Sequence, residues 1–105
     1  MPSHDVASLA DVPDDGVLGV GLPTGERICL IRWRGVVSAV RDECTHQAMP
    51  LSAGDVQPDG TIECAWHGAR FDCRTGAVRQ GPAEDDVAVY EVRVENGRVI
   101  VHTAD

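Results

Sequence analysis

Two short motifs, each joining a cysteine to a histidine, constrain this chain more than any other feature of its sequence. They read Cys44-Thr45-His46 and Cys64-Ala65-Trp66-His67, and seventeen residues lie between them. A cysteine and a histidine so close in sequence can reach one metal centre only where the backbone forms a loop. Each motif follows an expected β-strand and precedes a glycine, a proline or a turn. The sequence therefore predicts two opposed loops that hold one site.

Metal binding explains the two motifs better than the alternatives do. Cysteine and histidine also occur as ordinary buried side chains, but four of them in matched motifs are not expected by coincidence. Structural zinc accepts two cysteines and two histidines, yet zinc sites usually combine a Cys-x2–4-Cys arm with a His-x3–5-His arm. Here each arm supplies one residue of each type. Zinc is therefore the competing metal, and the mixed arms count against it.

Glycine and proline punctuate the chain at short intervals, which favours many short strands. Segments rich in valine and isoleucine lie between these turns, at residues 17–20, 27–33, 36–40, 61–64, 87–94 and 98–102. The clearest signal is near the C-terminus, where apolar residues from Ala88 to Val94 alternate with charged ones before Asn96-Gly97. This pattern predicts a hairpin with one buried face. No segment has a sustained helical period, so we expect an all-β fold of antiparallel sheets, a sandwich or a barrel.

Length and charge limit the function classes that fit this chain. Its 105 residues suit one domain spanning residues 1–105, and a domain this small often gains stability from a metal. Nine basic and seventeen acidic residues give a net charge of −8, which disfavours binding to nucleic acid or to an anionic membrane. The sequence also lacks a signal-peptide pattern and a run long enough for a membrane helix. We expect a cytoplasmic protein whose cysteines bind metal or are buried thiols rather than disulfides.

The spacing of the two motifs resembles the signature of Rieske 2Fe-2S proteins, in which two histidines replace two cysteines as ligands of one iron. The resemblance continues through Arg70-Phe71-Asp72 and Arg74-Thr75-Gly76 to Gly81-Pro82, and it covers the chain from about residue 17 onward. It implies a Rieske-type fold of small antiparallel sheets, with a cluster-binding subdomain of two loops at one tip. It also implies a proline-bearing loop against the cluster.

The resemblance implies one 2Fe-2S cluster with four ligands from this chain. Cys44 and Cys64 would bind one iron as thiolates, and His46 and His67 would bind the other through imidazole nitrogens. Two thiolates leave the oxidised cluster neutral, whereas four would leave it doubly negative. Because an electron is added more easily to a neutral centre, Rieske potentials of about −150 to +300 mV exceed the about −400 mV of plant-type ferredoxins. The two histidine edges are then the expected exit of the electron.

Four other positions indicate which branch of the family the chain resembles. High-potential Rieske proteins of cytochrome complexes carry a disulfide beneath the cluster and two hydroxyl groups that donate to its sulfurs. The matching disulfide positions here are Met49 and Trp66, and the matching hydroxyl positions are Ala69 and Phe71. Donors to sulfur stabilise the reduced state, so their absence predicts a potential towards the lower end of the Rieske range.

Low-potential Rieske proteins of this size resemble the ferredoxin component of bacterial ring-hydroxylating dioxygenase systems, which degrade aromatic hydrocarbons. The resemblance implies a monomeric carrier that takes single electrons from a flavoprotein NAD(P)H reductase and passes them to a terminal oxygenase. The chain itself would not be an enzyme. Only His4 and His102 remain for the oxygenase iron, and the sequence has no dinucleotide-binding fingerprint.

Two other functions stay open at this point. An electron carrier for a different redox system, such as one tied to iron-sulfur assembly, has the same ligands; nitrite reductase small subunits share the fold but typically lack them. A zinc-stabilised or redox-responsive interaction module belongs to a different functional class.

Four residues near the motifs carry expectations of their own. Cys29, in an apolar strand, is expected to be buried, and Cys73, beside a turn, to be exposed. Asp42 and Glu43 are expected to be a solvated acidic pair, with docking of a basic partner as the alternative.

Overall fold

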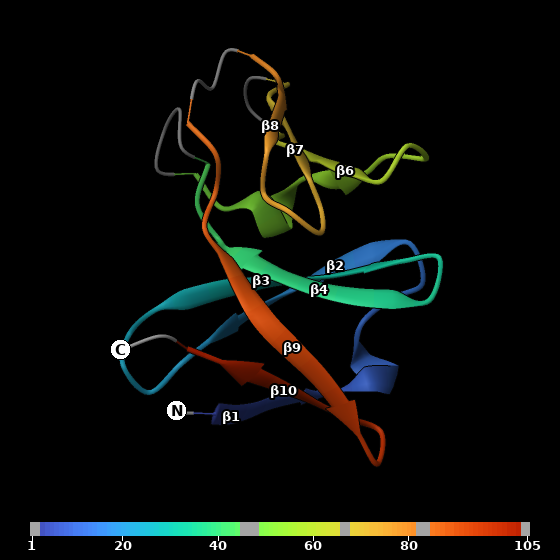
Figure 1. Cartoon of the computed structure of the whole chain (residues 1–105), viewed down its shortest axis with the longest axis vertical. Helices are drawn as coiled ribbons and strands as arrows, with labels where there is room; N and C mark the ends of the chain where they lie inside the picture. The colour runs from blue at the N-terminus through green and yellow to red at the C-terminus, as the bar shows by residue number, and fades with distance from the viewer. Residues whose placement is uncertain (1–2, 45–48, 66–67, 82–84, 104–105) are drawn as a thin grey trace.

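The chain folds into two antiparallel β-sheets, and the smaller sheet lies at one end of the larger one (Figure 1). The computed structural model describes residues 3–44, 49–65, 68–81 and 85–103. Across these ranges there are ten strands and two single turns of 3-10 helix, and no helix is long and apolar enough to cross a membrane. The all-β prediction is confirmed.

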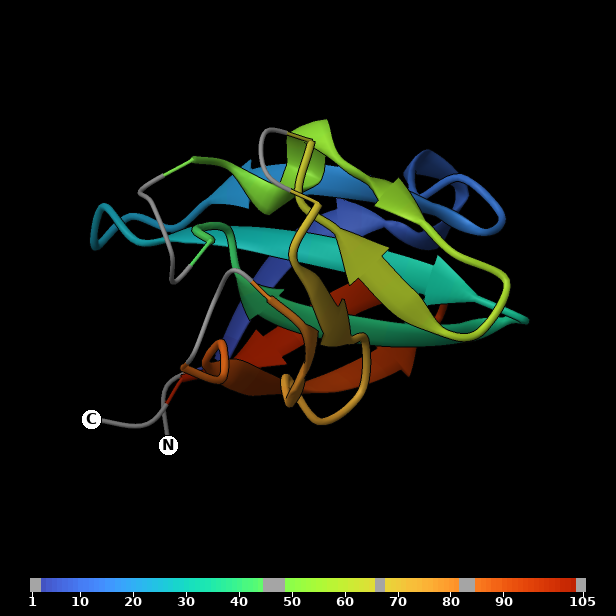
Figure 2. The same ribbon diagram turned by 90° about the horizontal axis from the view of Figure 1, so that it is seen from above.

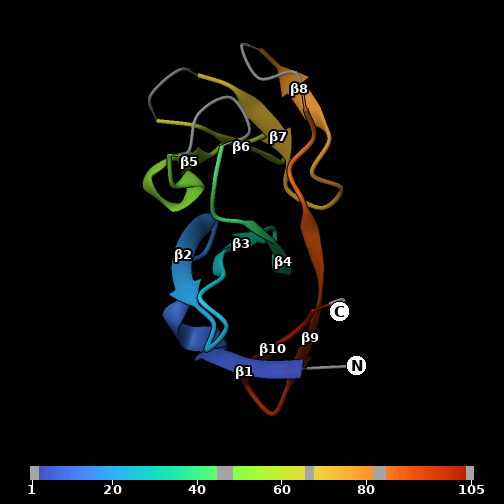
Figure 3. The same cartoon turned by 90° about the vertical axis from the view of Figure 1, so that its left-hand side faces the viewer.

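The larger sheet has six strands in the order β1-β10-β9-β4-β3-β2. They are β1 (Ser3–Ser8), β2 (Gly16–Gly21), β3 (Arg27–Trp33), β4 (Val36–Arg41), β9 (Val89–Glu95) and β10 (Arg98–His102). A turn of 3-10 helix, η1 (Leu9–Asp11), follows β1. The sheet curls until its edge strands β1 and β2 contact each other, as Figure 3 shows, and so encloses a core of its own.

The smaller sheet is inserted between two paired strands of the larger one. Its four strands lie in the order β5-β6-β7-β8. They are β5 (Asp55–Val56), β6 (Thr61–Glu63), β7 (Arg70–Asp72) and β8 (Val78–Gln80), preceded by the 3-10 turn η2 (Leu51–Ala53). The chain enters this segment from β4 and leaves it into β9, which pairs with β4. Seen from above in Figure 2, the segment lies over the larger sheet, and η2 packs against β2 and β3.

Strand β3 holds the two sheets together because its centre is buried on both faces. Ile28 and Leu30 belong to the core inside the larger sheet. Cys29 and Ile31, which alternate with them, belong to a second core shared with the smaller sheet, where Phe71 is the largest buried side chain. Burial of each large apolar side chain contributes about 1.5–3 kcal/mol. The uninterrupted apolar run of residues 28–31 is the sequence sign of such a strand.

The predicted strands are present, and their boundaries differ from the predicted ones by at most two residues. The Asn96-Gly97 turn is confirmed, since both residues have left-handed φ values, 50° and 74°, and Glu95 pairs with Arg98 across it. The strand expected from residue 87 begins at Val89, because the Val87 N–H donates to the Gly76 carbonyl instead. The sequence does not predict β1, β5, β7 or β8, which are short or lack an alternating pattern.

Candidate metal centre

The two motif cysteines lie together in the core shared by the two sheets. Cys44 comes three residues after β4, and Cys64 directly follows β6. Each is 1% exposed, and both belong to the same buried cluster. Two strands from different sheets thus bring together thiols that are far apart in sequence. The other two predicted ligands, His46 and His67, lie outside the described residues.

Equivalent backbone hydrogen bonds close the two loops at their necks. The Cys44 N–H donates to the Met49 carbonyl at 2.8 Å, and the Cys64 N–H donates to the Ala69 carbonyl at 2.7 Å. In each case the bond joins the cysteine to the residue five positions later. Each cysteine is therefore the residue at which a hydrogen-bonded segment begins, and that the two loops oppose each other across one site stays a prediction.

Strand β8 braces the second loop from outside. The Gln80 side-chain amide donates to the Gly68 carbonyl at 2.8 Å. Gly68 adopts a left-handed φ of 72°, a conformation that glycine reaches without strain, and its N–H donates to the Cys64 carbonyl. These contacts fix the backbone on the C-terminal side of the motif.

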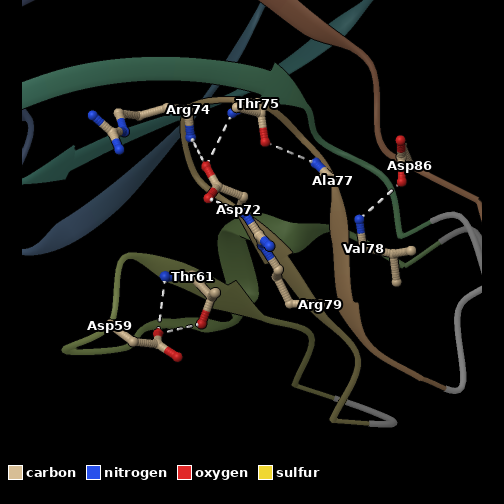
Figure 4. A network of polar contacts seen from close by, with 9 residues as sticks. All are labelled: Asp59, Thr61, Asp72, Arg74, Thr75, Ala77, Val78, Arg79 and Asp86. Atoms are coloured by element: carbon tan, nitrogen blue, oxygen red, sulfur yellow. Dashed lines mark hydrogen bonds and ion pairs between the residues drawn. The ribbon is translucent and has the colours of Figure 1, made fainter.

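An aspartate network stiffens the hairpins of the smaller sheet (Figure 4). Asp72 accepts hydrogen bonds from the backbone N–H groups of Arg74 and Thr75, at 2.9 and 3.1 Å, and pairs with Arg79 at 3.1 Å. Partial burial opposes ionisation of Asp72, but these three partners together outweigh it and lower the pKa.

The turn between β5 and β6 has a similar brace. Asp59 accepts hydrogen bonds from the Thr61 hydroxyl at 2.7 Å and from the Thr61 N–H at 3.1 Å. The hydroxyl bond is the main cause of the lowered pKa of Asp59. Asp59 and Asp72 are therefore ionised acceptors at the same end of the paired strands β6 and β7, where Thr61 pairs with Asp72 (Figure 4).

Asp42 and Glu43 do not form the expected solvated pair. Glu43 is exposed, but Asp42 is only 6% exposed. The Asp42 carboxylate accepts hydrogen bonds from the Ser52 N–H at 2.7 Å and from the Ser52 hydroxyl at 2.6 Å. The expectation is wrong for Asp42 because a partner ten residues later covers it, which no local pattern reveals.

Cys73 is buried as well, so the prediction of an exposed thiol there is wrong. It is 1% exposed because the chain turns inward after β7, and the Cys73 N–H donates to the Gly60 carbonyl at 3.0 Å. Cys29 is fully buried, as predicted. Both are free thiols, which agrees with the expectation that they do not form a disulfide.

Neither Cys29 nor Cys73 is expected to react with iodoacetamide in the folded protein at pH 8. Burial, with smaller contributions from Asp72 and Asp59, raises the pKa of Cys73 to about 12, and burial also raises the pKa of Cys29. The reactive thiolate is therefore scarce at both sites. Mass spectrometry after brief alkylation should find both unmodified until urea is added. Modification of either one in the native protein at the rate of a small thiol would contradict this.

A comparison of the chain with known protein families identifies the family to which it belongs. The family described as the Rieske [2Fe-2S] domain matches residues 3–91 of the chain. This chain belongs to the Rieske family. The sequence resemblance and the expected Rieske-type fold are thereby confirmed.

The Rieske proteins most similar to this chain include ferredoxins of dioxygenase systems. The ferredoxin component of the naphthalene 1,2-dioxygenase/salicylate 5-hydroxylase systems of Ralstonia sp is 37% identical over 92% of this chain and 91% of its own length. The ferredoxin of carbazole 1,9a-dioxygenase from Nocardioides aromaticivorans IC177 superposes with a TM-score of 0.89 at 27% identity, covering 96% of this chain and 97% of that one.

A ferredoxin in a complex of reduced oxygenase and oxidised ferredoxin, also of carbazole 1,9a-dioxygenase, is equally close. It has a TM-score of 0.87 and 28% identity, and the match covers 94% of this chain and 91% of that one. These relatives are electron-carrying components and not catalytic subunits. The prediction that this Rieske chain is not an enzyme is confirmed.

The described residues fit the cluster that the Rieske family implies. Cys44 and Cys64 supply two thiol donors, which suit one iron, at the necks of two loops in an apolar cluster. A bound iron would keep such a ligating thiol deprotonated. No group of three or more candidate ligands occurs among the described residues, from which His46 and His67 are left out.

Proposed function

We propose that this protein is a low-potential Rieske ferredoxin that carries single electrons from a flavoprotein NAD(P)H reductase to a terminal ring-hydroxylating oxygenase. In this proposal Cys44 and Cys64 bind one iron of a 2Fe-2S cluster, and His46 and His67 bind the other. The observation that carries it is the pair of buried motif cysteines at matched loop necks. The family match and the named dioxygenase ferredoxins support it.

The bound cluster supplies one-electron redox chemistry, and the protein holds, insulates and exposes it. The buried cysteines anchor one side in an apolar core that keeps water away. The hydrogen-bonded loop necks would hold Cys44 and Cys64 in place while a bound cluster changes its charge. The histidine side is the proposed route of the electron to a partner.

The proposed partners are proteins. A relative is known in complex with its oxygenase, which supports an oxygenase as the electron acceptor. The net charge of −8 favours a partner with a basic docking surface and disfavours nucleic acid and anionic membranes. We further propose a cytoplasmic monomer in which residues 1–105 form one domain.

The test is the EPR spectrum of the dithionite-reduced protein, with iron and acid-labile sulfide contents. A rhombic signal of low average g, with two irons and two sulfides per chain, is expected of a 2Fe-2S cluster with two histidine ligands. Stoichiometric zinc without an EPR signal would show that the protein is a zinc-stabilised structural module and not an electron carrier. A plant-type signal would exclude His46 and His67 as ligands. Reduction by a flavoprotein reductase and reoxidation by an oxygenase then test the direction of transfer.

The midpoint potential is expected towards the lower end of the Rieske range, which spans about −150 to +300 mV. Ala69 and Phe71, at the positions of the two hydroxyl donors in high-potential relatives, are fully buried and have no hydroxyl group. The reduced cluster therefore lacks two stabilising hydrogen bonds. Potentiometry monitored by EPR measures this, and a midpoint well above zero would show that other donors replace them.

A further inference from the structure

Asp42 is the only charged side chain that is buried among the described residues. It lies between the end of β4 and Cys44, two residues before the proposed ligand. Its backbone N–H donates to the Arg27 carbonyl at 3.0 Å, which keeps this segment in line with β3. A carboxylate buried at the base of a metal-binding loop is costly and calls for a specific explanation.

Ser52 holds the Asp42 carboxylate from the other end of the loop. Its N–H and its hydroxyl each donate to a different carboxylate oxygen, at 2.7 and 2.6 Å. Residues 42 and 52 therefore bracket the segment that contains Cys44 and its loop closure to Met49. Accepting hydrogen bonds at both oxygens is what an ionised carboxylate does.

Strand β2 closes the space beside this contact. A Cβ atom on Gly19 would lie 2.8 Å from the Ser52 hydroxyl oxygen and 3.1 Å from an Asp42 carboxylate oxygen. The glycine thus lets the backbone of β2 approach the pair directly. Within the part of the chain that the structure describes, Asp42 forms no ion pair with an arginine. Its carboxylate is therefore held by Ser52 and not by a direct ion pair, although Arg27 and Arg41 line the same surface pocket.

Asp42 lies beside the core that contains both motif cysteines, because Gly19, which approaches its carboxylate, pairs across the sheet with Cys29. Cys29 belongs to the same buried cluster as Cys44 and Cys64. Burial is the main cause of the raised pKa of Cys29, and the Asp42 charge is the next. A negative charge that disfavours a thiolate there also disfavours an electron added nearby, because interactions in a core are weakly screened.

We propose that Asp42 is a positioning and tuning residue that lowers the reduction potential of the cluster. This inference rests on the proposed function, in which Cys44 is a ligand. A bound cluster with two thiolate ligands would change from neutral to singly negative on accepting one electron from dithionite, and the fixed Asp42 carboxylate would oppose that change. Ser52 holds the carboxylate in place and partly offsets its charge.

The test is EPR-monitored potentiometry of the holoprotein with dithionite as reductant, on the wild type, Asp42→Asn, Glu43→Gln and Ser52→Ala. Asp42→Asn keeps the shape and should favour reduction about tenfold, which is about 59 mV upwards for one electron. Glu43→Gln removes the same charge one residue nearer Cys44, but from an exposed side chain, so its shift should be much smaller. Ser52→Ala removes the hydroxyl that donates to the Asp42 carboxylate. The negative charge of Asp42 is then offset less, so the reduction potential should fall.

The possible outcomes separate this inference from the proposed function. An unchanged potential in Asp42→Asn, or equal shifts in Asp42→Asn and Glu43→Gln, would overturn the role of Asp42 while leaving the carrier intact. If Asp42→Asn does not fold, Ser52→Ala decides: a lower potential supports the role, and an unchanged or higher one overturns it. A wild-type protein without the rhombic EPR signal would overturn the proposed function, and the inference with it.

Discussion

Cys44→Ser protein is expected to be purified without its iron-sulfur cluster. The serine hydroxyl does not ionise near neutral pH and is a poor substitute for a thiolate on iron. Cys44 is buried at the neck of its loop, where its N–H donates to the Met49 carbonyl. Visible absorbance, iron and sulfide should fall from two irons and two sulfides per chain to almost none. The thermal midpoint should fall too, because metal binding is coupled to folding.

Cys73→Ala is the matched control for Cys44→Ser. Cys73 is equally buried and lies in the same core cluster, but it belongs to neither motif. This variant should lose some stability and keep the full cluster content. His67→Ala should behave like Cys44→Ser. A Cys44→Ser or His67→Ala protein with undiminished absorbance would remove that residue from the ligand set, and cluster loss in Cys73→Ala would show that packing alone explains the result.

Gly54→Ala is expected to destabilise the protein by about 3 kcal/mol, at the upper end of what overpacking usually costs. A Cβ atom at this position would lie 1.9 Å from the Glu63 carbonyl oxygen and 3.2 Å from the Leu51 carbonyl oxygen. Both obstacles are backbone atoms, so the substitution must separate β5 and η2 from β6. Urea unfolding monitored by circular dichroism measures the loss, and in a domain of this size each kcal/mol lowers the thermal midpoint by about 4–8 °C.

The same displacement should reach the metal centre, because Glu63 immediately precedes Cys64. We expect Gly54→Ala protein to retain less iron than the wild type. Gly21→Ala is the control, since only the end of the Arg27 side chain lies near its added Cβ atom, at 4.0 Å. It should be neutral or slightly stabilising, as alanine usually is in a strand. Equal effects of the two substitutions would show that close approach at Gly54 does not matter.

Much of the site is readable from the sequence because its elements are local. A cysteine and a histidine one or two residues apart predict a loop, and the matched pair of such motifs predicts one centre shared by two loops. Two strands of the larger sheet are also readable, since the residues before Asn96-Gly97 alternate with the period of a strand and the short apolar run 28–31 is typical of a strand buried on both faces. These features depend on neighbours within a few residues.

The surroundings of the site depend on contacts between distant segments, and sequence patterns fail there. Cys73 lies beside a turn, which is the local pattern of an exposed thiol. In the structure it follows β7 and is buried in the core shared by the two sheets. The strands β5, β7 and β8 are too short to show a period, and pairing with their neighbours alone defines them.

The sequence by itself predicted the all-β class from its strand and turn patterns, and its two motifs carry the resemblance to the Rieske family, which implies the four proposed ligands. Only the tertiary structure decided that Cys44 and Cys64 share one core and that Asp42 is buried beside them. Asp42 meets Ser52 ten residues later, in a space that Gly19 leaves on a third segment. No local pattern encodes such a contact, since it exists only once the smaller sheet has packed against the larger one.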